Sequence, residues 1–340
     1  MPSHPSPRNL RRAVACLAGT LLLVSACGGT EDSASNTDAG LAGDSGVGEA
    51  YPVTIEHQFG ETEITDRPQR IVTLGITDHD PLLALGVTPI AVHPGFSMEN
   101  VGPWAEELLG DAEPKIFPSA TDPDPEEVLA LAPDLIIGVT SAMDQTTYDA
   151  LSELVPTVVR SADQADFAIP WQEHTEVIGQ AVGKPDEAAA LIEETETLLQ
   201  ETAEQNPELA GKTGATLLPN PDGGYWPYTD LDPRGQFLSS MGMRLPDALA
   251  ELDDGASFYL DLSAERMDLL EADVLVVLER DGDREAAEDD AVFQALDVVE
   301  RDDVIWLATG DPGLAMAHNT VLSIPFVIDE LVPQLVEKVR

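Results

Sequence analysis

Cysteine is almost absent from this sequence. Its 340 residues include two cysteines, Cys16 and Cys27. Cys16 lies in an apolar N-terminal segment that we expect to be cleaved off, which leaves Cys27 as the single cysteine of the mature chain. One cysteine excludes an intramolecular disulfide. The roughly 290 residues that follow the N-terminal region are enough for two domains with adequate cores, so no cross-link is required.

Basic residues are scarce as well. Lysine and arginine number 17 against 63 aspartates and glutamates, and the formal net charge is -46 at pH 7. A charge of this sign and size argues against nucleic acid as a partner and against adhesion to anionic lipid, because both are negatively charged. We interpret the acidic excess as a solvated surface that keeps the protein soluble.

Motifs of catalysis and of metal binding are missing. The sequence contains no Gly-x-Ser-x-Gly, no P-loop, no dinucleotide fingerprint and no His-Glu-x-x-His. Four scattered histidines show no metal-ligand spacing: His57, His79, His93 and His174. We therefore expect a protein that is not an enzyme and that has neither a catalytic residue, a metal site nor a cofactor.

The N-terminus has the pattern of an export signal. Three arginines among residues 8–12 precede the apolar residues 13–24, a stretch too short to span a bilayer. It ends in Val24-Ser25-Ala26-Cys27, the bacterial lipobox pattern, in which the cysteine is linked to diacylglycerol. We predict a lipoprotein signal peptide over residues 1–26 and lipidation of Cys27. An ordinary secretory signal and an uncleaved membrane helix remain alternatives.

Residues 27–50 are mostly Gly, Ser, Ala, Asp, Thr and Glu, with almost no bulky apolar side chain. Such a segment cannot bury enough surface to offset the entropy of ordering, so it is predicted to be a flexible tether. A tether between a lipid and a globular body lets the body reach a membrane-embedded partner. The expected location is the extracytoplasmic face of the cell membrane.

Beyond residue 51 the sequence alternates short apolar runs with helical patterns, which indicates an α/β fold. The predicted strands of a first lobe, residues 51–168, are 71–74, 89–92, 134–139 and 157–159. Asp80 is predicted to cap a helix that Gly86 closes, and Asp124 to cap another with Glu127 at the capping-box position.

A long amphipathic pattern separates this lobe from a second one. From residue 186 apolar residues recur at helical spacing with acidic residues between them, and residues 169–206 are predicted to form a connecting helix. Strand-like runs then return over 213–218, 273–278 and 303–307 within a second lobe, residues 207–340. The predicted layout is one α/β lobe, one long helix and another α/β lobe.

The two lobes share an internal similarity. Glu126 lies eight residues before Asp134, and Glu265 lies eight residues before Asp273; each aspartate opens an apolar run. Each glutamate is predicted in the first turn of a short helix, where negative charge suits the helix dipole. The offset suggests two glutamates at equivalent places on two similar lobes.

Short segments spread from about residue 53 to the C-terminus resemble one family. They are Phe59-Gly60, Arg67-Pro68-Gln69-Arg70-Ile71-Val72, Thr77-Asp78, Leu82-Leu83-Ala84-Leu85-Gly86-Val87, Leu131-Ala132-Pro133-Asp134-Leu135-Ile136, Ile178-Gly179, Gly183-Lys184, Leu269-Leu270 and Val321-Leu322-Ser323-Ile324-Pro325-Phe326. Their order and spacing are similar to those of the helical-backbone (class III) periplasmic-binding-protein family, whose members carry ferric siderophores, haem or cobalamin.

The resemblance implies two Rossmann-like lobes joined by one long backbone helix, with the ligand in a cleft between lobes that move little. It implies a substrate-binding lipoprotein of an ABC importer that captures a ferric siderophore and delivers it to the permease. Glu126 and Glu265 occupy the positions at which family members dock onto arginines of the permease subunits. Haem or cobalamin is the alternative ligand, an α/β enzyme is a remote one, and a monomer is expected.

Ligands of doubly wound lobes lie beyond the C-terminal ends of the strands, so the loops there hold the candidate ligand-binding residues. These are Phe96, Thr140, Met143, Tyr225, Trp226, Tyr228, Arg234 and His318. Three of the four residues from 225 to 228 are aromatics in a Gly- and Pro-rich loop, which suits a bulky chelate but also loop packing. Arg234 is predicted to contact ligand oxygens or to pair with Asp232 or Asp230.

Two further expectations concern ligand type. His318 is predicted to be a hydrogen-bonding residue, with haem or metal ligation as the alternative. A ferric tricatecholate is strongly anionic, whereas ferric trihydroxamates are neutral or cationic. Because an acidic protein repels an anionic chelate at long range, a hydroxamate or mixed siderophore is preferred.

Overall fold

The N-terminal lobe contains a hairpin and a parallel sheet. The computed structural model describes residues 51–95, 98, 100–118, 123–221, 223–280 and 282–340, all within the unit Val47–Arg340. Cys27 and Phe96 lie outside the described residues. The strands are β1 (Val53–His57), β2 (Gly60–Ile64), β3 (Ile71–Thr73), β4 (Ala91–Val92), β5 (Lys115–Ile116), β6 (Leu135–Gly138) and β7 (Thr157–Val159). The hairpin β1-β2 is antiparallel, and the sheet has the order β5-β4-β3-β6-β7 with parallel neighbours.

The C-terminal lobe contains a smaller sheet in the order β11-β10-β8-β9. Its strands are β8 (Gly214–Pro219), β9 (Tyr225–Pro227), β10 (Val274–Glu279) and β11 (Val304–Ala308). Strands β8, β10 and β11 are parallel, and β9 is antiparallel to β8 at the edge. The predicted strands of both lobes are confirmed to within a few residues. The prediction of an aromatic loop around residue 225 is wrong in part, because the three residues of β9 pair with the end of β8.

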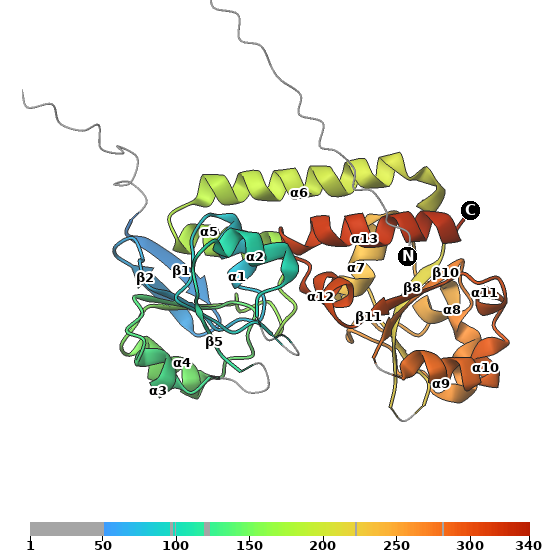
Figure 1. The fold of residues 1–340 in the computed structure, drawn as a ribbon. Helices are drawn as coiled ribbons and strands as arrows, with labels where there is room; N and C mark the ends of the chain where they lie inside the picture. The colour runs from blue at the N-terminus through green and yellow to red at the C-terminus, as the bar shows by residue number, and fades with distance from the viewer. Residues whose placement is uncertain (1–50, 96–97, 99, 119–122, 222, 281) are drawn as a thin grey trace, which may run out of the picture. The chain divides into compact units, whose positions relative to one another are not determined.

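Helices surround both sheets (Figure 1). In the N-terminal lobe they are α1 (His79–Ala84), α2 (Pro103–Leu109), α3 (Pro125–Leu129) and α4 (Gln145–Ser152). In the C-terminal lobe they are α7 (Pro233–Ser240), α8 (Asp247–Ala250), α9 (Asp283–Asp289), α10 (Ala291–Gln294), α11 (Asp297–Glu300), α12 (Asp311–His318), α13 (Ser323–Lys338) and the 3₁₀ turns η1 (Pro207–Leu209) and η2 (Ala264–Leu270).

The segment predicted as one connecting helix forms two. Helix α5 (Trp171–Ala181) packs on the N-terminal lobe, and α6 (Pro185–Gln205) runs past both lobes beside α13 (Figure 1). The break has two causes: Gly183 adopts φ +69°, which ends α5, and Pro185 begins α6 at a position where its missing N–H costs nothing. The 21 residues of α6 form the physical link between the lobes.

Two predicted helix caps differ from the structure. The N-cap of α1 is Asp78 instead of Asp80, and its side chain makes no cap hydrogen bond. Both carboxylates are fully buried and bond to other segments. Asp124 caps α3 as predicted by accepting from the Glu126 N–H at 2.8 Å. Glu127, expected to complete a capping box, pairs with Lys115 on β5.

The sequence similarity between the lobes has a structural counterpart. Asp134, before β6, accepts hydrogen bonds from the N–H groups of Gln69 and Arg70, which precede β3. Asp273, before β10, accepts hydrogen bonds from the N–H and hydroxyl groups of Thr213, which precedes β8. In each lobe an aspartate at the start of one strand therefore fixes the start of the neighbouring parallel strand.

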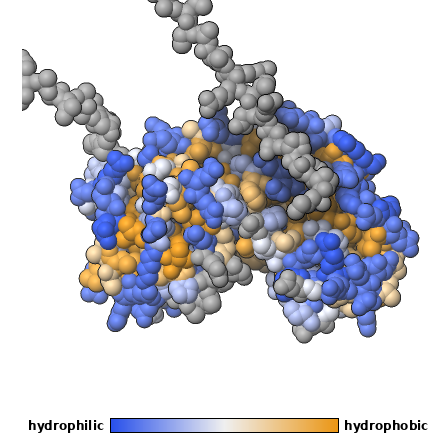
Figure 2. Space-filling view, viewed as in Figure 1, coloured by the Kyte–Doolittle hydropathy of each residue, from blue (hydrophilic) through white to orange (hydrophobic). Residues whose placement is uncertain are grey.

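Apolar cores fill both lobes. The largest core cluster contains buried side chains of α7, α12 and α13, and it also includes Trp171 at the start of α5. Trp104 of the N-terminal lobe packs against this cluster. Figure 2 shows hydrophilic residues interspersed with hydrophobic ones over both lobes on the visible face. Among the described residues, no helix is both long and apolar enough to cross a membrane.

Contact between α5 and α6 generates the first prediction. A Cβ on Gly179 would lie 2.3 Å from the Ala188 Cβ, so Gly179→Ala has to push the two helices apart. We expect the free energy of unfolding to fall by about 1–3 kcal/mol, measured by urea denaturation. The control is Glu193→Ala, which places an alanine at an exposed position of α6, and its effect is expected to stay within about 0.5 kcal/mol. Equal effects of both substitutions would contradict the packing argument.

Candidate functional site

A cleft lies between the two lobes. It consists of a small and a larger cavity that share Ile76 and Phe167 of the N-terminal lobe and Pro233, Ala317 and His318 of the C-terminal lobe. The larger cavity has a volume of about 480 Å³, within the usual range for small-molecule sites. Ile76 and Thr140 follow β3 and β6, the neighbouring strands from which the chain turns in opposite directions. This is the switch point at which doubly wound sheets bind ligands.

The N-terminal side of the cleft is fixed by the buried carboxylate of Asp78. Its Oδ1 accepts from the Thr140 N–H and hydroxyl at 3.0 and 2.7 Å and lies 3.0 Å from His174 Nε2 on α5. Its Oδ2 accepts from the Gly75 and Val139 N–H groups, both at 3.0 Å. Gly75 allows this approach, since a Cβ there would lie 2.1 Å from Asp78 Oδ2.

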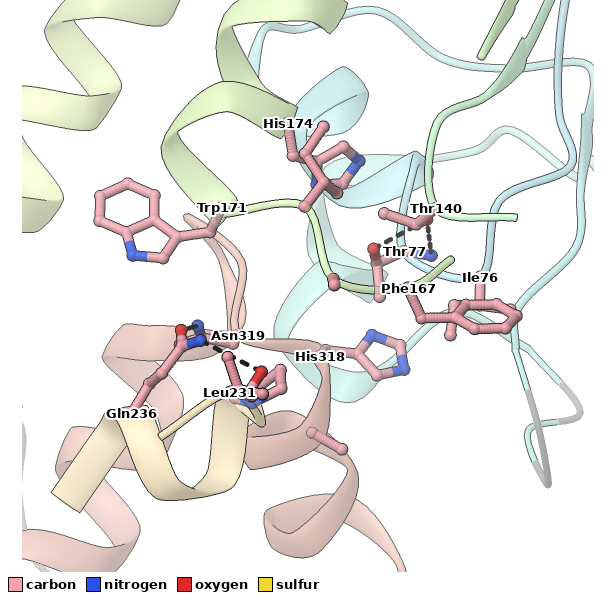
Figure 3. Close-up of a pocket in the computed structure, with 14 residues that line it drawn as sticks. Ile76, Thr77, Thr140, Phe167, Trp171, His174, Leu231, Gln236, His318 and Asn319 are labelled. Atoms are coloured by element: carbon pink, nitrogen blue, oxygen red, sulfur yellow. Dashed lines mark hydrogen bonds between the residues drawn. The ribbon is translucent and has the colours of Figure 1, made fainter. Parts of the chain in front are cut away.

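The hydrogen-bond donors around Asp78 keep this carboxylate ionised. Burial raises the pKa of Asp78, but the hydrogen bond and charge of His174 and the hydrogen bonds from Thr140 outweigh burial and hold the pKa below its usual value. The Thr140 hydroxyl also accepts from the N–H of Thr77 at 3.1 Å. Figure 3 shows Thr77, Thr140 and His174 around the small cavity, with His318 across from them. This side of the cleft is therefore polar and rigid.

The larger cavity has an aromatic wall. Trp226 lies with its ring 5.6 Å from that of Tyr259, and its Nε1 donates to Asp261 at 3.1 Å. Tyr228 and Phe258 line the same cavity, and Phe167 faces it from the N-terminal lobe. Phe167 and Tyr259 remain 38% and 46% exposed. Large exposed aromatics that converge on one cavity are typical of a binding site.

Arg234 belongs to an ion pair. Its Nε and Nη2 donate to Asp232 at 2.6 and 2.7 Å, and its guanidinium lies 3.6 Å from the centre of the Tyr228 ring. The predicted alternative for Arg234, a pair with Asp232, is confirmed. Burial raises the pKa of Tyr228, although Arg234 opposes this effect, so the phenol stays neutral. The pair cancels the two formal charges on this wall of the cleft.

Three titratable side chains meet beneath the cleft, where α1 approaches α12. His79 and Asp80 are fully buried, and the 9%-exposed His318 joins them from the end of α12. The ligand-type atoms of the three residues lie within 4.8 Å of one another. Burial lowers the pKa of His79 to about 4, although the charge of Asp80 opposes this shift. The spacing of the histidines along the chain gave no sign of this convergence.

Four of the predicted ligand residues stand together on the larger cavity or next to it: Trp226, Tyr228, Arg234 and His318. Thr140 lines the smaller cavity. Two others lie elsewhere: Tyr225 is in the core of the C-terminal lobe with its ring stacked 5.2 Å from Phe293, and Met143 packs against the apolar cluster around Val72 and Leu151. Tyr225 points into the core because it lies on strand β9, where neighbouring side chains point to opposite faces of the sheet.

Several residues that line the cleft were not predicted from the sequence. Phe167, Leu231 and Tyr259 are exposed apolar side chains that line the cleft. Phe167 has a φ of +63°, which is unusual for an aromatic residue, and it lines both cavities. No sequence period marks these residues, because they lie in irregular segments between elements. An isolated Phe in the polar stretch 161–168 was the only available signal.

Glu126 and Glu265 each lie in the first turn of a short helix, as predicted. Glu126 is in the first turn of α3 and Glu265 in the first turn of η2, and both side chains are exposed. Each follows a residue at the helix start with extended backbone, Asp124 and Ser263 respectively. Both carboxylates are therefore accessible to a partner.

Comparisons with known proteins agree with this architecture. Residues 71–305 match the family described as periplasmic binding protein. The chain is 28% identical over 261 residues to the probable siderophore-binding lipoprotein YfiY of Bacillus subtilis, covering 75% of this chain and 74% of that protein. Among solved structures it resembles a periplasmic solute binding protein from Mycobacterium smegmatis, with a TM-score of 0.74, 32% identity and coverage of 85% and 99%. It also resembles Streptococcus pneumoniae PiaA in complex with ferrichrome, with a TM-score of 0.72, 26% identity and coverage of 84% and 98%.

The Asp78 network generates the second prediction. Asp78→Asn replaces one acceptor oxygen with an NH₂ group that faces N–H donors, so we expect the free energy of unfolding to fall by about 3 kcal/mol or more in urea denaturation. The matched control is Asp124→Asn at the exposed cap of α3, where asparagine caps equally well and the change should stay within about 0.5 kcal/mol. A loss at position 78 no larger than at position 124 would contradict the role assigned to this carboxylate.

Proposed function

The chain belongs to the periplasmic-binding-protein family, and from this premise we propose that it captures a ferric siderophore outside the cytoplasm and delivers it to the permease of an ABC importer. The observation that carries the proposal is the cleft between the lobes. It combines a volume of about 480 Å³ with an aromatic wall on one lobe and a fixed polar edge on the other. The similarity to YfiY and to PiaA, solved with ferrichrome, supports this class of ligand.

The composition of the cleft suits a chelate with an organic backbone. Trp226, Tyr259 and Phe167 offer flat apolar surface, and Thr140 and His318 offer hydrogen-bonding groups at the floor. The siderophore keeps the iron coordinated, and the protein contributes a preformed surface. In this proposal the protein is a binding module with no chemistry of its own.

Charge favours a hydroxamate or mixed siderophore. Among the described residues that line the two cavities, the one arginine is Arg234, and Asp232 already neutralises it. A strongly anionic tricatecholate needs cationic partners that the cleft does not supply, and the net charge of -46 repels it at longer range. Neutral or cationic ferric trihydroxamates meet neither obstacle.

Membrane attachment and docking complete the proposal. The lipobox that ends at Cys27 and the polar residues after it support a lipid anchor with a flexible tether, which keeps a monomeric body near the permease. Glu126 and Glu265 support docking, because each is exposed in the first turn of a short helix and lies eight residues before the aspartate that precedes a parallel strand of its lobe. Ion pairs at such a rim fix the orientation and the rate of encounter more than the affinity.

The third prediction tests the aromatic wall. We expect ferrioxamine to bind the wild-type protein and ferric catecholate or haemin to bind much more weakly, as measured by isothermal titration calorimetry. Tyr259→Ala and Trp226→Ala should each raise the Kd for ferrioxamine about tenfold, because each removes a stacking surface worth about 1.4 kcal/mol. Tyr225→Phe is the control, since the Tyr225 ring lies in the core.

Two outcomes would contradict the third prediction. Binding of haemin alone would show that the cleft takes a different metal complex. Undiminished ferrioxamine binding by Trp226→Ala with Tyr259→Ala would show that the aromatic wall is not the ligand surface.

The fourth prediction concerns docking. Glu126→Ala combined with Glu265→Ala should lower siderophore-dependent iron uptake by cells at least about tenfold and leave the Kd for the siderophore unchanged, because both carboxylates lie outside the two cavities. The control is Glu193→Ala with Glu201→Ala, which removes the same charge from exposed positions on α6. Equal iron uptake by the two double variants would show that Glu126 and Glu265 do not dock onto the permease.

A further inference from the structure

Residues of both lobes converge where α1 packs beside α12, beneath the cleft. His79 Nε2 lies 3.4 Å from Asp80 Oδ1, and His318 Nδ1 lies 3.8 Å from Asp80 Oδ2. These distances exceed those of ordinary N–H···O hydrogen bonds, so neither imidazole is engaged by the carboxylate in this way. Two imidazoles and one carboxylate thus approach one another at ion-pair distances that are longer than ordinary hydrogen bonds.

The facing atoms are buried and lack hydrogen-bond partners. Among the described residues, both ring nitrogens of His79, Oδ1 of Asp80 and Nδ1 of His318 have no hydrogen-bond partner, although His79 and Asp80 are completely buried. A buried polar atom without a partner costs about 1–3 kcal/mol. One such atom from each of the three residues lies in one place, which indicates that a bound group satisfies these three atoms in the functional protein.

The surrounding side chains hold the carboxylate in a fixed orientation. Asp80 Oδ2 accepts from Trp104 Nε1 at 2.8 Å and from the Thr320 hydroxyl at 2.6 Å, which leaves Oδ1 directed at His79. The Trp104 ring also lies edge-on to the His318 ring at 5.1 Å. The site therefore has supporting contacts that orient its ligand-type atoms, as established metal sites do.

The other lobe shows what this carboxylate lacks. Residues 77–81 and 229–233 both read Thr-Asp-x-Asp-Pro, and each segment leads into the first helix after the first parallel strand of its lobe. In the C-terminal lobe the second aspartate, Asp232, pairs with the cationic Arg234. At the equivalent place Asp80 faces two imidazoles. A bound cation would supply the positive charge that Arg234 provides for Asp232.

We propose that His79, Asp80 and His318 form a binding site for one divalent transition-metal ion of the zinc type, with ligands from both lobes. Two imidazole nitrogens and one carboxylate oxygen are a common ligand set for such ions, whereas Mg²⁺ and Ca²⁺ prefer oxygen ligands throughout. With metal–ligand bonds of about 2.0–2.1 Å, ligand atoms of a tetrahedral site lie roughly 3.4 Å apart. The ligand-type atoms all lie within 4.8 Å of one another, so the widest separation has to close by at most about 1.4 Å to reach that value.

A metal at this site would act as a clamp between the lobes. Asp80 and His79 belong to α1, and His318 ends α12, whose side chains line the cleft. The ion is separate from the iron of the siderophore, which its chelator already coordinates. The proposal therefore stands whether or not the cleft binds a siderophore.

The fifth prediction is metal binding by the siderophore-free protein. The acidic surface attracts every divalent cation, so titrations are run in high salt with Mg²⁺ and Ca²⁺ as comparisons. We expect Zn²⁺ to bind with one ion per chain in calorimetry and to raise the Tm. Co²⁺ should give the visible absorption bands of a site with imidazole ligands, and Mg²⁺ and Ca²⁺ should do neither.

Substitutions locate the ion. His79→Gln and Asp80→Asn should each weaken Zn²⁺ binding at least about tenfold and abolish the Co²⁺ bands. His57→Gln is the matched control, because His57 is a buried histidine of the β1-β2 hairpin that contacts Thr62 and Tyr148. His318→Gln provides a further ligand variant, and circular dichroism checks that each variant is folded.

Two results would overturn the proposal. One is the absence of saturable Zn²⁺ and Co²⁺ binding by the wild-type protein in high salt. The other is wild-type Zn²⁺ affinity in a folded His79→Gln or His318→Gln variant. If variants at position 79 do not fold, crystals of the wild-type protein soaked with Zn²⁺ decide the matter: an anomalous peak among the three side chains supports the site, and a peak elsewhere or none rejects it.

Discussion

The geometry of the cleft depends on one buried carboxylate, that of Asp78. Its two oxygens collect donors from Gly75 after β3, from Val139 and Thr140 after β6, and from His174 on α5. The carboxylate thereby ties the ends of two parallel strands to the helix that leads into α6. Because α6 carries the connection to the other lobe, the polar edge of the cleft and the aromatic wall opposite are held in place before any ligand arrives. Such preorganisation lowers the entropic cost of binding.

Local and long-range electrostatics act on a ligand in the same direction. The whole protein is strongly acidic, yet within the cleft Asp232 and Arg234 neutralise each other and the Tyr228 ring covers the guanidinium. The long-range field therefore disfavours anions, and the described residues that line the cleft include no unpaired arginine that would reverse this preference. A neutral or cationic chelate loses little on approach and gains aromatic contact on arrival. Specificity then follows from the exclusion of negatively charged ligands as much as from attraction.

Much of the fold could be predicted from the sequence, and less of the site. The parallel strands are continuous apolar runs that end at turn residues, a signal contained in a few consecutive positions. Strand β9 was not predicted, because it is short and is flanked by Gly and Pro. Its side chains alternate between the two faces of the sheet, so Tyr225 and Trp226 point in opposite directions. Asp78 and Asp80 look equivalent as caps, and only their distant partners distinguish them. His79 and His318 are far apart in the chain, so no local sequence pattern predicts that they lie close together.

A crystal structure of the protein with a ferric trihydroxamate tests the central claim most directly. The account predicts that the chelate lies between the lobes, with its organic backbone against Trp226 and Tyr259 and its other side toward Phe167 and His318. The iron should keep its hydroxamate ligands and make no bond to the protein. A chelate bound on another surface, or iron ligated directly by side chains of the cleft, would contradict the account.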